Sequence, residues 1–299
     1  LVDTAFLQNR ISTVMTEHAG VLLGMYGDFL RPEDIAQGRV PTALFGCYTN
    51  ALTLFMLVPA LTQAFGVSAL PSVTAAWTSG RPKLESSIEN VLRIVALITM
   101  PAGIALSVLS GPIASLLGYN PITGKILVLL GLGSIFAAAN IPINSMLQAV
   151  GRLDLPVKLL CVGLVIKIGL NYVLTGIPEI NVMGAGFGTL VCYFFLTFFG
   201  LAALGKETHM ELRLFRLFGK PFLASVAAAA AGWQVSHLVQ RVLPGRWEAL
   251  FSMAAFVLVY VFCVLFLRIL RKSDLQALPG TEKITKILEN HHWIGYNKL

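Results

Sequence analysis

A lysine in the middle of a long apolar stretch is the residue of this sequence with the clearest chemical potential. Lys167 stands ten residues into the apolar run that begins at Val157. In an α-helix that separation is about 15 Å, roughly half of a hydrocarbon core about 30 Å thick. A lysine side chain spans only about 6 Å, too short to carry its ammonium to the membrane surface from that depth. We therefore expect the ammonium to face other helices or a wet cavity, where it could bind an anionic group.

Amide and hydroxyl side chains in the apolar runs could add hydrogen bonds to the same site. Asn171 follows Lys167 by four residues, which places both on one helix face. The same spacing aligns three amides of another run, although Pro142 lies among them and could bend that face. The alternative for Lys167 is a structural lysine, bonded to carbonyls or to Asn171 between helices. The predicted cavity residues are Lys167, Asn171, Asn140, Asn144, Gln148, Asn50 and Thr53.

Two further charged pairs have helical spacing. Asp3 and Arg10 are seven residues apart, so they share a face and form either a gate or cavity ion pair or a pair at the end of a span. Arg93 follows Glu89 by four residues and is interpreted as an interfacial pair at the edge of a span.

The composition indicates an integral membrane protein. The 299 residues are 56% hydrophobic and 12% charged, with a mean hydropathy of +0.76, whereas soluble domains carry about 25% charged residues. The net charge of +7 does not indicate a nucleic-acid partner, because the basic residues fall mostly in loops between apolar runs and form no basic groove with interleaved aromatics.

Seven apolar runs predict an all-α membrane protein, a polytopic bundle of about seven transmembrane helices. Each run has roughly the 20 residues that a crossing requires. The predicted spans are 42–66, 89–111, 124–148, 157–176, 184–204, 219–240 and 248–269.

Three regions follow from these spans. Residues 1–40 are expected to hold the end of a cut helix followed by an external loop, because the chain opens on an apolar run and then becomes mixed. Residues 41–270 form the helical bundle, and 271–299 form a tail. Most of the 22 Lys and Arg residues lie in the loops after the odd-numbered spans and in the tail. The positive-inside rule therefore predicts a cytoplasmic C-terminus and an external N-terminal loop.

Prolines and glycines within the spans predict irregular, closely packed helices. Pro59, Pro101 and Pro142 each free a main-chain carbonyl that neighbouring helices or water must satisfy. A glycine series at 184, 186 and 188 permits close approach of a neighbouring helix.

The residues do not predict an enzyme. A membrane enzyme needs an acid–base pair or a nucleophile near the interface, and no Ser/His/Asp or paired-carboxylate arrangement emerges. The absence of a glycine-rich phosphate loop with a lysine excludes a P-loop ATPase. We predict no cofactor and no metal site.

Three passages together resemble a known family: Leu70-Pro71-Ser72-Val73 with the residues up to Arg81, then 147–158, and then 167–186. They are similar to the polysaccharide-transporter branch of the superfamily that also contains MATE exporters and lipid II flippases, and most similar to its stage V sporulation protein B group. The resemblance extends from Asp3 to about Arg271.

The resemblance implies a fold and a function. Family members have two pseudo-symmetric lobes, so these seven spans would be the C-terminal lobe and the missing N-terminal lobe would be its partner. Alternating access between lobes would move lipid-linked oligosaccharides, polysaccharide precursors or peptidoglycan precursors. Lipid II flippases carry an arginine in the first of these spans. Here the segment Cys47 to Thr53 has no charge, so the resemblance does not imply lipid II itself.

Two alternatives remain. A MATE-like cation-coupled drug exporter would be expected to bind cations with carboxylates inside spans, and here Asp and Glu occur only at span edges, as Glu89 and Glu248, or at Asp3. A membrane scaffold for envelope or spore assembly would transport nothing and would not need the charge of Lys167.

Overall fold

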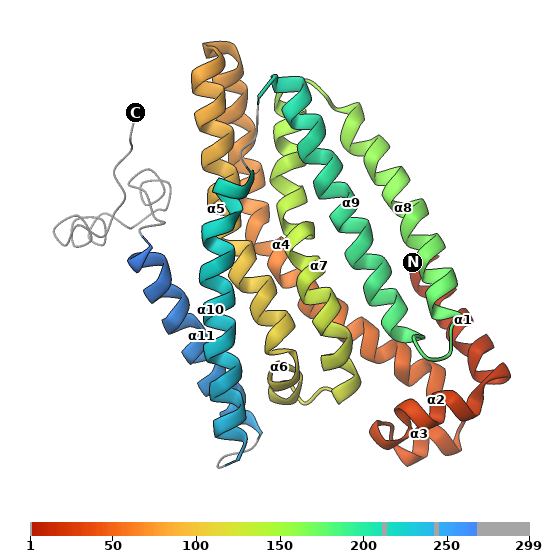
Figure 1. Cartoon of the computed structure of the whole chain (residues 1–299). Helices are drawn as coiled ribbons and strands as arrows, with labels where there is room; N and C mark the ends of the chain where they lie inside the picture. The colour runs from red at the N-terminus through yellow and green to blue at the C-terminus, as the bar shows by residue number, and fades with distance from the viewer. Residues whose placement is uncertain (1, 211–213, 242–244, 268–299) are drawn as a thin grey trace.

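The structure, a computed structural model, describes residues 2–210, 214–241 and 245–267, and every regular element within them is helical (Figure 1). The predicted tail, 271–299, lies outside the described residues. The elements are α1 (Val2–Glu17), α2 (Ala19–Tyr26), η1 (Gly27–Phe29), α3 (Pro32–Ala36), α4 (Val40–Ser79), α5 (Arg81–Val108), α6 (Ser110–Leu116), α7 (Pro121–Ala149), α8 (Asp154–Thr175), α9 (Val182–Thr208), α10 (Leu214–Gln240) and α11 (Arg246–Phe266).

Seven of the described helices are long and apolar enough to cross a membrane, namely α4, α5, α7, α8, α9, α10 and α11. Each overlaps one of the predicted spans along most of its length, so the all-α polytopic fold predicted from the sequence is confirmed. The physical reason is that a backbone in hydrocarbon must satisfy its own N–H and C=O groups, which the α-helix does within one segment.

The first two spans are joined differently from the prediction. The sequence suggested a loop between 66 and 89, but α4 continues to Ser79 and α5 begins at Arg81. Gly80 joins them with a φ of 108°, a conformation that an L side chain rarely adopts. The Leu70–Val73 motif is therefore helical, and Pro71 lies inside α4.

The N-terminal region is also more helical than expected. Residues 9–40 were interpreted as a loop with short helical pieces, but α1 extends to Glu17. Leu7, Ile11 and Val14 form an i, i+4, i+7 stripe that is completely buried and packs in the same hydrophobic cluster as Leu44 of α4. The buried stripe explains why this mixed sequence remains helical.

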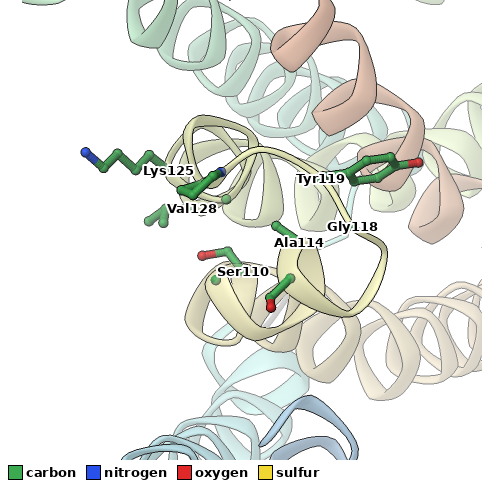
Figure 2. Close-up of a pocket in the computed structure, with 10 residues that line it drawn as sticks. Ser110, Ala114, Gly118, Tyr119, Lys125 and Val128 are labelled. Carbon is green, nitrogen blue, oxygen red and sulfur yellow. The ribbon is translucent and has the colours of Figure 1, made fainter. Parts of the chain in front are cut away.

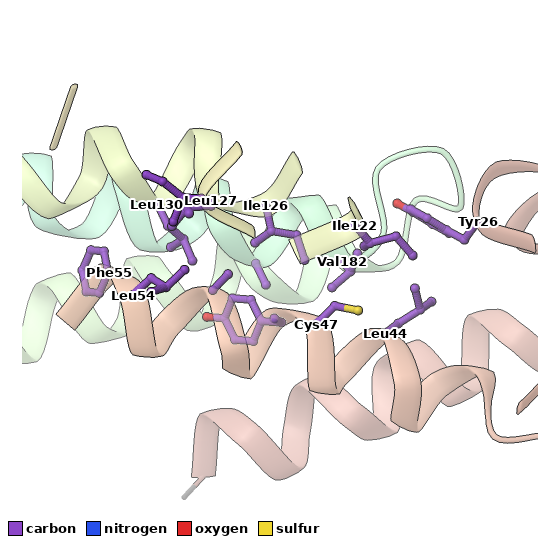
Figure 3. Packing of buried hydrophobic residues seen from close by; sticks show 14 of the residues in the cluster. Tyr26, Leu44, Cys47, Leu54, Phe55, Ile122, Ile126, Leu127, Leu130 and Val182 are labelled. Carbon is purple, nitrogen blue, oxygen red and sulfur yellow. The ribbon is translucent and has the colours of Figure 1, made fainter. Parts of the chain in front are cut away.

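Helix α7 lies at the centre of the bundle. It packs against α4, α9, α5 and α6, with the pair α8–α9 on one flank and the pair α10–α11 on the other (Figure 1). Its Ile122, Ile126, Leu127 and Leu130 are fully buried and meet the apolar face of α4 (Figure 3).

Glycines bring α5 and α7 into direct backbone contact. A methyl group added at Gly103 would overlap Ile135 and the main-chain oxygen of Gly131, and one added at Gly131 would overlap the backbone of Ser107. At this contact Ser107 Oγ donates a hydrogen bond of 2.8 Å to the main-chain oxygen of Val128. Small residues thus permit the close approach that stabilises helix pairs where lipid gives no hydrophobic driving force.

For two prolines inside helices, a hydroxyl group on a neighbouring helix donates a hydrogen bond to the carbonyl that the proline frees. Pro142 cannot donate to the main-chain oxygen of Ala138, and buried Thr62 of α4 donates to that oxygen at 2.9 Å. Pro101 likewise frees the main-chain oxygen of Leu97, which accepts a 2.7 Å hydrogen bond from the Tyr260 hydroxyl of α11. The prediction that neighbouring helices satisfy the freed carbonyls is confirmed for these two prolines.

We predict that Thr62→Val destabilises the protein by about 1 kcal/mol, because the buried Ala138 oxygen loses its partner. In the Pro142→Ala background the restored main-chain N–H can bond that oxygen, so the same change should cost clearly less. Unfolding in mixed micelles measures both. Thr74→Val is the matched control, because Thr74 is exposed and bonds only a carbonyl of its own helix in the described structure. Equal costs in the two backgrounds would contradict the assignment.

Candidate functional site around Lys167

Lys167 lies on the face of α8 that packs against α9. Four residues before it, Gly163 fits against Leu196, and four residues after it, Asn171 fits against Gly188. A methyl group at Gly188 would overlap Asn171 Oδ1. The lysine therefore belongs to the seam between two helices and is half-buried there.

Aromatic and hydroxyl groups of α9 and α4 border the lysine. The Lys167 ammonium is close enough to the Tyr193 phenol of α9 to interact with it electrostatically. Tyr193 in turn packs on Phe55 of α4, with 5.5 Å between ring centroids. One turn along, Tyr48 of α4 and Thr189 of α9 share a hydrogen bond of 3.3 Å. Tyr193 of α9 thus lies between Lys167 of α8 and Phe55 of α4.

Asn171 shares the face of Lys167, as its spacing predicts, but it is 0% exposed. Its side chain fills the space that Gly188 leaves open. In this structure Asn171 therefore packs α8 against α9 beneath the lysine and does not line an open surface.

Helix α1 approaches α8 through Arg10. The Arg10 guanidinium lies over the Tyr172 ring at 4.6 Å, and the Phe6 ring packs on the same tyrosine at 5.7 Å. Such a cation–π contact holds the arginine without neutralising its charge. The side chain of Asp3, its predicted partner, lies outside the described residues.

Of the three amide side chains predicted on α7, two are partly buried and the third is exposed. Asn140 lies near Gly200 of α9, Asn144 is half-buried, and Gln148 is exposed near the end of the helix. Gly200 is seven residues, or two turns, beyond Tyr193 on α9. Asn140 and Lys167 therefore border the same helix at different levels.

The polar residues predicted on α4 occupy its less buried sides. Asn50 is half-buried, and Thr53 is exposed with its hydroxyl bonded to the main-chain oxygen of Thr49. Lys167 and Asn171 thus lie together on α8, and Asn140 of α7 lies beside α9. Gln148 and Thr53, in contrast, lie on exposed surfaces.

A buried cation that the sequence interpretation placed at an interface lies on α5. Arg93 is 6% exposed, and its guanidinium donates to Asn90 Oδ1 at 3.2 Å. Asn90 lines a pocket of about 370 Å³ between α4 and α5, with Ser68, Ser72 and Ser87. The predicted span did not indicate this burial, because α5 begins eight residues before that span and Arg93 lies well inside a longer helix. The sequence feature that could have indicated a buried arginine is Asn90, a hydrogen-bond acceptor three residues before Arg93 on the same helix face.

Ionic contacts secure the end of the α8–α9 pair at which α8 begins. Arg152, in the turn before α8, forms a 2.8 Å salt bridge with Glu207 of α9, and the Glu207 carboxylate raises the pKa of the Arg152 guanidinium. The Arg81 guanidinium donates to the main-chain oxygen of His209. Among the described residues no group of His, Cys, Asp and Glu could hold a metal ion.

A protein-family model matches part of the chain. The family described as MatE matches residues 37–173, a stretch that contains α4, α5, α7 and most of α8. The match agrees with the apolar helical bundle that these helices form.

One known protein is similar in sequence to a longer stretch of the chain. The chain is 27% identical over 258 residues to the lipid II flippase MurJ of Bacillus subtilis (strain 168). The match covers 76% of this chain and 44% of the relative, so the chain spans less than half the length of that protein.

We predict that Gly188→Ala destabilises the α8–α9 pair by about 2 kcal/mol, because the added methyl group overlaps the Asn171 amide. Thermal unfolding in detergent measures the loss. Gly169→Ala on α8 is the matched control, since a methyl group there meets no neighbouring atom. Asn171→Ala should restore stability in the Gly188→Ala protein, and failure to do so would contradict the packing role of Asn171.

Proposed function

We propose that this chain forms one lobe of a transporter that moves a lipid-linked oligosaccharide, polysaccharide or peptidoglycan precursor across the membrane by alternating access. The observation that carries the proposal is the half-buried Lys167, held between α8 and α9 beside Tyr193. By helix rise the lysine is about 12 Å from the Thr175 end of α8 and about 20 Å from its Asp154 end, so its ammonium is far from both surfaces.

The chemistry of such a substrate requires a cation at this depth. A lipid-linked sugar carries its headgroup on phosphate, and a charged group alone in hydrocarbon costs many kcal/mol. An ammonium on the route offsets part of that cost through charge-assisted hydrogen bonds. Asn140, Asn144 and Gln148, with Asn50 and Thr53, would supply hydrogen bonds to sugar hydroxyls on the same route. Asn171 would hold the lysine from beneath.

A second lobe would complete the cavity. The matched relative is more than twice as long as the stretch that this chain matches, since the match covers 44% of it. We propose that the partner is an N-terminal lobe, and that Arg10 with Asp3 lies near the junction as a gate or ion pair. The finer assignment, to the polysaccharide-transporter branch and its stage V sporulation protein B group, rests on the motifs at 70–73, 147–158 and 167–186.

We predict that Lys167→Gln in the full-length protein lowers transport by roughly tenfold to a hundredfold, the range expected for losing one charge-assisted hydrogen bond. The assay is surface exposure of the labelled lipid-linked precursor in cells that lack their own flippases. Lys167→Arg, which keeps the positive charge, should retain more activity than Lys167→Gln.

The matched control is Lys158→Gln, which removes the same charge from the exposed end of α8, where Lys158 pairs with Asp154. It should transport normally. Membrane levels of each variant separate a transport defect from a folding defect. If Lys167→Gln transports as well as the wild type, Lys167 is structural. If the wild type restores no exposure, the exporter and scaffold alternatives gain support.

We also propose a cytoplasmic C-terminus, because the ends of α4, α7 and α9 adjoin the basic loops. Single cysteines at Thr78 and at Glu33, introduced after replacement of the four native cysteines, test this orientation. An impermeant thiol reagent applied to intact cells should label the cysteine at position 33 and spare the one at 78. The reverse pattern would invert the topology.

A further inference from the structure

A pocket of about 400 Å³ lies between α6 and the beginning of α7 (Figure 2). Its lining includes the cation Lys125, two serines and three glycines, and it includes no carboxylate. We propose that this pocket binds the phosphate of an anionic phospholipid. The site is separate from Lys167: α6 packs towards α11, whereas α8 lies on the opposite flank of the bundle (Figure 1).

Ser110 supplies a hydroxyl group. The residue is 6% exposed and lines the pocket. Figure 2 shows this hydroxyl on the same side of the pocket as Lys125, with Val128 between them. A serine hydroxyl that lines a pocket can donate a hydrogen bond to an oxygen atom of a bound ligand.

Lys125 supplies the positive charge. Its side chain is exposed, and its Nζ lies 4.3 Å from the centre of the Phe29 ring of η1. The ring holds the ammonium on one side without neutralising its charge, and no ion pair with Lys125 occurs among the described residues. The remaining N–H groups can therefore donate to a phosphate oxygen, as lysine commonly does in phosphate sites.

Glycines form a floor that a phosphate can approach closely. Gly111 of α6 and Gly124 of α7 pack directly on each other, since a methyl group at Gly124 would lie 3.3 Å from the Gly111 Cα. Without side chains at these positions the backbone of both helices borders the pocket.

Apolar residues next to the cation identify a lipid as the source of the phosphate. Lys125, Val128 and Leu132 have i, i+3, i+7 spacing, so they share one face of α7. Val128 is 40% exposed and Leu132 is 39% exposed, although most of this helix is buried. A headgroup at Lys125 would therefore continue into an acyl chain along Val128 and Leu132. A free phosphate has no apolar part that would contact Val128 and Leu132. On the predicted topology this is the external leaflet.

The test is a titration of the purified full-length protein with phosphatidylglycerol, followed by native mass spectrometry to obtain the Kd of the first bound lipid. Lys125→Gln should raise this Kd roughly tenfold and Ser110→Ala several-fold, because each removes one hydrogen bond to the phosphate. Leu132→Asn should also weaken binding. Lys158→Gln, the same charge change elsewhere on the protein, should leave the Kd unchanged.

Two further arms identify the ligand. Phosphatidylcholine, whose headgroup has no net charge, should bind clearly more weakly than phosphatidylglycerol, and inorganic phosphate in excess should not displace the lipid. Equal affinity for the two lipids, or unchanged affinity in both Lys125→Gln and Ser110→Ala, overturns the proposal. Displacement by inorganic phosphate, with Leu132→Asn unaffected, would reassign the pocket to the free anion. Transport through Lys167 is measured separately, so failure here leaves the proposed function untouched.

Discussion

The constraint on which this structure depends is that main-chain carbonyls must find donors where water is scarce. An α-helix meets that demand within itself until a proline interrupts it. Pro142 and Pro101 interrupt α7 and α5, and hydroxyl groups from α4 and α11 satisfy the freed carbonyls at 2.9 and 2.7 Å. These bonds link α4 to α7 and α11 to α5, and the Thr62 hydroxyl also lies 3.0 Å from the main-chain oxygen of Pro59 in its own helix.

Close packing and the candidate site are linked in the α8–α9 seam. Gly184 and Gly188 let α8 approach, and Leu174 and Asn171 fill the space they leave. Asn171 is buried at the cost of desolvating an amide, and it lies one turn from Lys167. A lysine in hydrocarbon is expensive. The seam holds it half-buried beside Tyr193.

The two cationic sites that we propose differ in how they would meet anions. Lys167 lies between helices at a depth where an anion arrives only with help from the protein, which suits a site that substrate occupies transiently. Lys125 lies at the end of α7 beside an open pocket and an exposed apolar strip, which suits a lipid that remains bound.

The sequence by itself determined the membrane class and the number of candidate spans, and it placed Lys167 in the middle of one of them, because apolar length and helix rise are local properties. It also identified the glycines and prolines as sites of close approach and of freed carbonyls. Only the tertiary structure decided which helix donates a hydrogen bond to the carbonyl that each of these prolines frees, that Asn171 packs under Lys167, and that Arg93 is buried. Those outcomes depend on which faces of distant helices meet. Sequence composition also did not predict that α4 and α5 are joined at Gly80 or that α1 extends to Glu17. Burial against other helices sets both features, and local composition does not.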